Sequence, residues 1–75
     1  MCHVTFQRVA NDEARILADG EYVGDLYRQR DILSPDAVLY IVHLEDDPRG
    51  WCRVHERRRV REVAVERIRT HPFRC

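Results

Sequence analysis

The chain of 75 residues contains no lysine and only one serine, and it has no apolar run of the length that crosses a membrane, which takes about 20 residues. Its first nine residues, MCHVTFQRV, do not place a charged segment ahead of an apolar one, so we expect no secretory signal. These absences predict a cytoplasmic protein that does not enter a membrane.

Cysteine is scarce and poorly placed for a disulfide framework. The three cysteines are Cys2, Cys52 and Cys75, an odd number with two at the ends of the chain. This arrangement fits a reducing compartment. A chain of this length forms a single small domain, residues 1–75, and buries only roughly 60% of its unfolded surface. Dimerisation is one natural way to stabilise so small a core.

Charge is balanced in total and uneven along the chain. Thirteen arginines, which GC-rich coding favours over lysine, face thirteen acidic residues. Residues 1–50 carry ten acidic residues and five arginines, a net charge of −5, whereas residues 51–75 carry three and eight, a net charge of +5. This asymmetry predicts a surface with an acidic end and a basic end.

The first part of the sequence predicts strands joined by turns. Residues 3–9, 14–18 and 21–28 read as strands, and residues 11–13 as the first turn. Asp19-Gly20 stands between the second and third strands. It predicts a type I′ hairpin, because glycine takes a positive φ without steric cost. Residues 29–37 read as a polar connection.

The second part of the sequence predicts one more strand, a turn and a helix. Residues 38–44 are apolar on both faces, which places them in the middle of a sheet. Asp47-Pro48-Arg49-Gly50 fits a type I turn. Residues 51–54 are either a fifth strand or an early start of the helix. From about residue 56 to residue 70 the apolar period is helical, and Pro72 ends it.

The apolar stripe of that helix consists of Val60, Val63, Ala64 and Ile68. A helix with one apolar stripe packs that stripe on the sheet. The predicted fold is therefore α+β: an antiparallel β-meander of four to five strands with one C-terminal α-helix packed on the sheet.

Cysteine and histidine offer two candidate chemistries, a zinc site and a thiolate nucleophile. Cys52-x-x-His55 and His71-x-x-x-Cys75 resemble zinc-ligand spacing, but a helix between them is roughly 20 Å long, so its ends cannot share one ion. His43 can approach Cys52 across the hairpin as the base for a thiolate, yet no glycine-rich loop is there to supply an oxyanion hole. We therefore expect no metal, no cofactor and no enzymatic activity.

The runs ADGEYVGDLY and VLYIVHLEDDPRGWCRV, followed by a helix, resemble the central strands and first helix of the GNAT acetyltransferases over residues 18–69. The family's pyrophosphate loop has an Arg/Gln-x-x-Gly-x-Gly/Ala pattern. Here Arg49-Gly50-Trp51-Cys52 supplies one glycine, and two larger side chains follow it. The resemblance thus implies, as an alternative, a truncated acetyltransferase-like domain without activity.

The arginine-rich start of the helix has three readings, in this order: a solvated helix back, a protein contact, and a nucleic-acid contact. The outer face pairs its charges, because Arg59–Glu62 and Glu66–Arg69 stand three residues apart and Arg58–Glu62 four apart. A pI near 6.9 argues against nucleic acid. The candidate residues for a partner or a nucleic acid are Trp51, Arg53, Arg57, Arg58, Arg59 and Arg61.

The acidic part of the chain is the other candidate contact. An acidic face can dock on a basic surface, including one that belongs to a nucleic-acid-binding complex. Tyrosine, tryptophan and arginine, the residue types enriched at binding hot spots, are also present, and edge strands can pair in a homodimer. The candidate residues of this face are Asp25, Asp31, Asp36, Glu45, Asp46 and Asp47.

We therefore expect a small, non-enzymatic binding protein of bacterial or phage origin that docks on a macromolecular partner, in an inhibitor role of the anti-CRISPR type. The alternative is a nucleic-acid-binding accessory or regulatory protein that uses the arginine-rich start of the helix.

Overall fold

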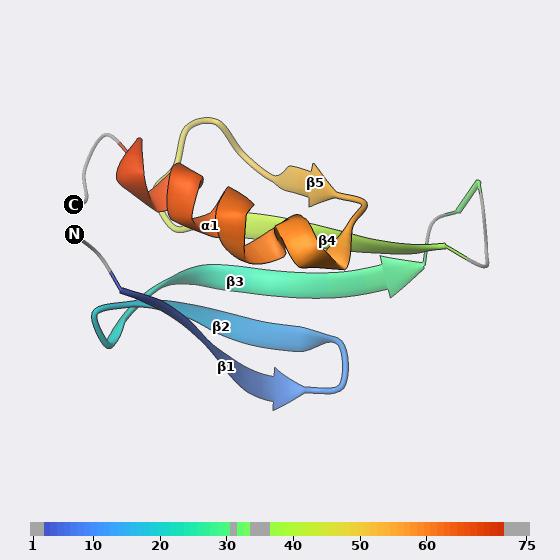
Figure 1. Ribbon diagram of the computed structural model, residues 1–75, viewed down its shortest axis with the longest axis horizontal. Coiled ribbons are helices and arrows are strands. Elements are labelled where there is room, and N and C mark those ends of the chain that lie inside the picture. Colours follow the sequence, from blue (N-terminus) through green and yellow to red (C-terminus); the bar gives the residue numbers. More distant parts are fainter. Residues whose placement is uncertain (1–2, 31, 34–36, 72–75) are drawn as a thin grey trace.

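The computed structural model describes residues 3–30, 32–33 and 37–71. Its elements are β1 (Val4–Ala10), β2 (Glu13–Ala18), β3 (Glu21–Arg30), β4 (Val38–Leu44), β5 (Cys52–Val54), a 3₁₀ turn η1 (Arg57–Arg59) and α1 (Val60–Arg69). The five strands form one antiparallel sheet in sequence order, and α1 packs on one of its faces (Figure 1). The predicted α+β meander is confirmed, with residues 52–54 as its fifth strand.

Two predicted turns are confirmed by their backbone geometry. Asp19 and Gly20 have φ angles of 52° and 84°, the two positive values that a type I′ turn requires. The Asp19 carboxylate also accepts a hydrogen bond from the His3 backbone N–H at 2.8 Å, which ties this turn to the start of β1. After β4, the Gly50 N–H donates to the Asp47 carbonyl at 3.2 Å and closes the second turn.

Two predicted boundaries need correction. β3 runs to Arg30, because Gln29 and Arg30 still pair with the first residues of β4 despite their polar side chains. The helix does not start as an α-helix at residue 56: Arg57–Arg59 form a 3₁₀ turn, and Glu56 gives no side-chain cap. The predicted helix end at Pro72 lies outside the described residues, and α1 ends at Arg69.

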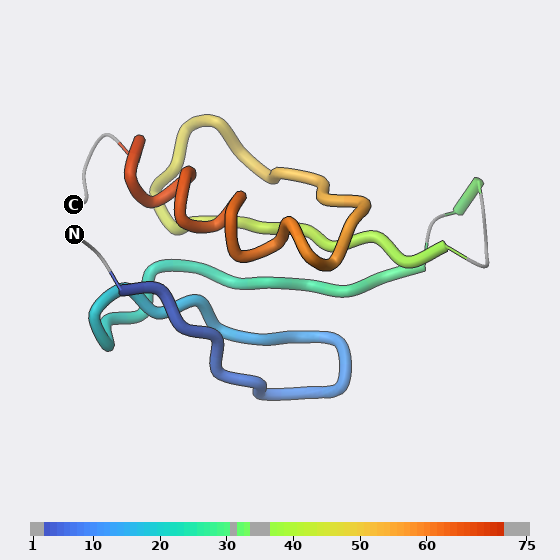
Figure 2. Tube along the Cα trace, in the orientation of Figure 1, coloured from blue at the N-terminus to red at the C-terminus, as the bar shows by residue number. Residues whose placement is uncertain are grey.

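The core lies between α1 and one face of the sheet. Val60, Ala64 and Ile68, three residues of the predicted stripe, are buried against strand residues such as Ile16 and Val42. α1 runs back along β4 and also contacts β1 (Figure 2). The strands thus bury the side chains that point toward the helix, at every second position.

The other face of the sheet carries no helix within the part of the chain that the structure describes. The strand register places alternate side chains on it, and we call this surface the open face. Its main residues are Arg15, Leu17, Tyr22, Asp25, Tyr27, Ile41, His43, Trp51 and Arg53. No helix among the described residues has the length and apolarity needed to cross a bilayer.

Candidate functional site

An exposed tryptophan dominates the open face. Trp51 is the residue before β5, and it is 61% exposed. Its ring stacks on the Tyr27 ring, with centroids 5.8 Å apart and planes 14° apart. It also lies 5.3 Å from the His43 ring, at a tilt of 50°. Because Tyr27 belongs to β3 and β4 lies between β3 and β5, Trp51 reaches across a whole strand.

An aliphatic side chain, Ile41, is buried on the open face. This side chain is only 5% exposed, although it faces away from the helix and does not belong to the main core cluster. In the sheet it lies directly opposite Tyr27 on one side and Arg53 on the other. The open face therefore has a buried aliphatic residue of its own, next to the tyrosine on which Trp51 stacks.

A tyrosine and a carboxylate are paired on the same face. The Tyr22 hydroxyl donates a 2.6 Å hydrogen bond to Asp25 Oδ2, and this bond is the main reason that the pKa of Tyr22 rises to about 12. The pKa of Tyr27 is also raised, first by burial and then by the charges of Asp25 and Glu13. Arg15 places its guanidinium carbon 5.8 Å from the centre of the Tyr22 ring. Both tyrosines on this face therefore stay neutral at physiological pH.

The predicted acidic residues do not all reach one surface. Asp25 lies on the open face, and Glu45 is near enough for both charges to raise the pKa of Tyr22. Asp46 is exposed in the turn after β4, with a φ of 59°. Asp31 and Asp36 lie outside the described residues.

Asp47 is not available to a partner, because its carboxylate is buried and already bound. Oδ1 accepts hydrogen bonds at 2.9 Å from the Arg49 backbone N–H and from its Nε, and Oδ2 accepts one at 2.8 Å from Nη2. These bonds are the main cause that lowers the pKa of Asp47 to about 2. Arg67 Nη1 lies 3.6 Å from Oδ2 and adds an electrostatic contact. This group fastens the β4–β5 turn to the end of α1.

The predicted basic helix start is divided among separate surfaces. Arg53 pairs opposite Ile41, so with Trp51 it belongs to the open face. Arg61 turns the other way, donates to the Val4 carbonyl at 2.5 Å and places its guanidinium carbon 5.3 Å from the Phe6 ring centre.

The two middle arginines of that start remain on the helix back. Arg58 pairs with Glu56 at 2.8 Å and not with Glu62 as predicted, because the 3₁₀ turn changes the spacing. Arg59 lies 3.9 Å from Glu62. Farther along, Arg69 pairs with Glu66 at 2.7 Å. These exposed pairs agree with the reading of a solvated helix back, and such pairs contribute little to stability.

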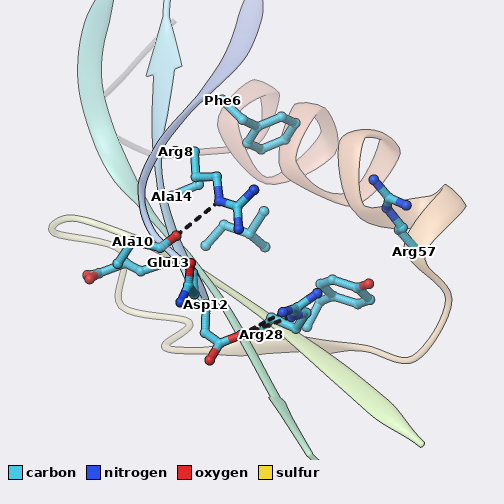
Figure 3. Close-up of a pocket in the computed structure, with 11 residues that line it drawn as sticks. Phe6, Arg8, Ala10, Asp12, Glu13, Ala14, Arg28 and Arg57 are labelled. Carbon is cyan, nitrogen blue, oxygen red and sulfur yellow. Dashed lines mark hydrogen bonds and ion pairs between the residues drawn. The ribbon is translucent and has the colours of Figure 1, made fainter.

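Arg57 lines a hollow on the helix side of the sheet that contains two further arginines. We call this site the arginine hollow, and Figure 3 shows it. Its principal residues are Phe6, Arg8, Leu26, Arg28, Tyr40 and Arg57. Sequence reasoning did not find it, because its three arginines come from β1, β3 and η1 and only the register brings them together.

His43 does not approach Cys52 across the hairpin, the arrangement that a thiolate with a histidine base would need. In the β4–β5 ladder Cys52 pairs with Val42, so His43, the next residue of β4, faces the opposite side of the sheet. Cys52 packs against the core, and His43 meets Trp51. The structure describes no group of three histidine, cysteine or acidic side chains placed to hold a metal ion within residues 3–30, 32–33 and 37–71. Cys75, the last residue of the zinc pattern, lies outside this part of the chain.

No family model matches this chain, and neither a curated protein nor a solved structure shows a significant match to it. The resemblance to the GNAT acetyltransferases therefore gains no support from these comparisons.

Proposed function

We propose that this chain is a small, non-enzymatic binding protein that docks on a protein partner through the open face of its sheet, with Trp51 as the anchor. The observation that carries the proposal is the 61% exposure of a tryptophan held in place by a stacked tyrosine. Tryptophan, tyrosine and arginine are the types most enriched among residues that dominate binding energy. A ring that is already fixed also loses little conformational entropy on binding.

The charges of the open face suit a protein better than a nucleic acid. Arg15 pairs opposite Asp25, and Glu45 is close enough for its charge to raise the pKa of Tyr22. Together with Arg53, these residues give the surface charges of both signs. Nucleic-acid binding draws on a concentrated basic footprint, and carboxylates beside it repel phosphate. A protein surface can match charges of both signs at fixed positions.

The groups on this face suit contact more than proton transfer. A catalytic acid or base works best with a pKa near the operating pH, whereas the Tyr22 pKa lies near 12. Docking on a nucleic-acid-binding complex, in an inhibitor role of the anti-CRISPR type and of bacterial or phage origin, is a narrower form of the proposal. The division of charge along the chain is its only support.

A comparison of two exposed apolar side chains tests the proposal. Tagged wild-type protein, Trp51→Ala and Val65→Ala are used to capture partners from an extract of the producing cells. Val65 is the matched control, because it is 38% exposed and belongs to α1, away from the open face. We expect a captured partner, once purified, to bind Trp51→Ala at least about tenfold more weakly than the other two proteins. Equal binding by all three proteins overturns the open face as the contact.

A second titration separates the alternative class of partner. Labelled single- and double-stranded DNA and RNA are added at about 50 and 200 mM salt, where phosphate contacts lose affinity steeply. We expect no binding at micromolar protein. If binding is salt-dependent and requires Trp51 and Arg53, the proposed partner is instead a single-stranded nucleic acid whose bases stack on the rings.

A further inference from the structure

The arginine hollow lies on the helix side of the sheet. At the turn between β1 and β2 it adjoins the open face, because Asp12 and Arg28 line both this hollow and a second one that contains Trp51. The arginine hollow opens where α1 no longer covers the strands, beside the turn between β1 and β2. Figure 3 shows Arg8 and Arg57 on opposite sides of the hollow, one carried by β1 and the other by the turn that precedes α1. Its volume is about 320 Å³, within the range of about 300–1,000 Å³ found for small-ligand sites.

Two of the three guanidinium groups there have no carboxylate partner among the described residues. Arg28 is neutralised, because Asp12 Oδ1 accepts from its Nε at 3.0 Å and from its Nη2 at 2.9 Å. Arg8 uses only its Nε, in a 3.3 Å hydrogen bond to the Ala10 carbonyl. For Arg57 the described part of the chain supplies no ion pair. The hollow therefore offers about two positive charges that are not compensated.

Glu13 is the second acidic residue at the rim of the hollow, after Asp12, and its charge acts on the open face. Glu13 contributes to the lining of the hollow, but in the ladder it pairs with Tyr27, a residue of the open face. Its charge is one of the causes that raise the pKa of Tyr27. The Glu13 carboxylate is therefore expected to repel an anion bound in the hollow only weakly.

The floor of the hollow is apolar. Phe6, Leu26 and Tyr40 are half-buried there and pack against the main core. All three side chains point toward the helix side of the sheet, as the strand register requires. A ligand in the hollow meets aromatic and aliphatic surface beneath and guanidinium groups at the rim.

We propose that the arginine hollow binds a phosphate monoester that carries an apolar or aromatic body. A phosphate monoester has a charge between about −1.5 and −2 at neutral pH and three acceptor oxygens. Two guanidinium groups match that charge, and each presents donors in a fork that fits phosphate. A carboxylate carries one charge and leaves the second arginine uncompensated, whereas the apolar floor favours a body attached to the phosphate over the free ion.

Phenyl phosphate is the probe, titrated into the full chain by calorimetry at constant ionic strength. We expect saturable binding with a dissociation constant of about a millimolar or below. Arg8→Ala and Arg57→Ala each weaken binding roughly tenfold, the usual loss for a hydrogen bond to a charged group. Arg58→Ala is the matched control: Arg58 follows Arg57 in the same turn, is paired with Glu56 and does not line the hollow.

Further arms test the chemistry of the ligand. Inorganic phosphate and benzoate both bind more weakly than phenyl phosphate. Binding strengthens as the pH rises through the second phosphate pKa of about 6. Asp12→Asn tightens binding, because it releases Arg28 from its carboxylate.

Three results overturn the proposal. The first is the absence of saturable binding at about ten times the expected dissociation constant. The second is an equal loss in Arg57→Ala and Arg58→Ala, which reveals only a diffuse effect of charge. The third is equal affinity for inorganic phosphate and phenyl phosphate, which shows that the apolar floor does not contribute to binding. None of these results bears on docking through the open face, because Arg8, Arg57 and Arg58 do not line the hollow that contains Trp51.

Discussion

Trp51 stacks on Tyr27 across the width of β4, with 5.8 Å between the ring centroids and 14° between their planes. Tyr27 also lies directly opposite Ile41, an aliphatic residue of the open face that is only 5% exposed. The Trp51 ring remains the largest exposed aromatic surface of the described chain. Under the proposed function, Trp51 would contribute to both stability and binding, and variants can separate the two roles.

Trp51→Ala is expected to lower the free energy of unfolding by about 1–2 kcal/mol. The change removes an aromatic pair, worth about 0.5–1.5 kcal/mol beyond its buried area, together with that buried area. Trp51→Phe retains a ring that can stack on Tyr27 and is expected to lose less than half as much. Urea unfolding followed by circular dichroism measures both variants. A urea midpoint for Trp51→Ala equal to that of the wild type contradicts a stabilising role for the Trp51–Tyr27 stack.

The Asp47 carboxylate makes stability depend on pH in the acid range. Its pKa is lowered from 3.8 to about 2 in the folded state. The stabilisation is therefore fully present above pH 3.8 and is lost as the pH falls through about 2. A shift of this size corresponds to about 2 kcal/mol. When the pH falls from 3.8 to about 2, the wild type is expected to lose this contribution to its unfolding free energy. Asp47→Asn lacks the carboxylate, so its unfolding free energy is expected to decrease less, by about 2 kcal/mol, over the same pH range.

Thermal unfolding at a series of pH values measures that difference. Asp46→Asn is the control. Asp46 is the residue before Asp47, its side chain is exposed, and asparagine tolerates its positive φ. Parallel pH curves for the wild type and Asp47→Asn contradict the role of the Arg49–Asp47 group.

Gly24→Ala is expected to destabilise the fold by about 3 kcal/mol or more. A Cβ at Gly24 overlaps the His43 carbonyl oxygen and comes within 2.8 Å of Leu44 Cα, both backbone atoms of β4 that cannot move aside. Gly20→Ala is the comparison, because no atom lies within 4 Å of its added Cβ and only the positive φ of 84° opposes it. That variant is expected to lose about 1 kcal/mol. Equal midpoints in urea for the two variants contradict this account.

The pKa of Tyr22 depends mainly on one hydrogen bond. Asp25→Asn removes the charge of its acceptor and is expected to bring the pKa from about 12 back toward the ordinary value of 10.0. An alkaline titration of phenolate absorbance, with Tyr22→Phe to assign the signal, measures the shift. The more distant carboxylate Glu45 supplies the control, since Glu45→Gln is expected to lower this pKa much less. Equal shifts in the two variants show that general charge, and not the hydrogen bond, governs it.

The backbone of this protein was largely predictable from local patterns. Asp19-Gly20 specified a hairpin because few residues accept two positive φ angles in succession. The apolar run of β4 and the stripe of Val60, Ala64 and Ile68 predicted an inner strand and a helix packed on the sheet. These signals concern residues close in sequence, whose geometry depends on their own backbone and side-chain types. The extension of β3 to Arg30 was missed because pairing with β4, not propensity, maintains it.

The surfaces were decided by the tertiary structure. The sequence grouped Asp47 with exposed acids and Arg61 with contact arginines, whereas packing buries the first and turns the second onto Phe6 and β1. It also gave no reason to connect Arg8 with Arg57, or Trp51 with Tyr27. Such neighbours depend on the register of strands and on which face the helix covers, since a shift of one residue moves every side chain to the opposite face. Composition and period thus determined the elements of the fold, and their pairing in space determined which side chains are available to bind.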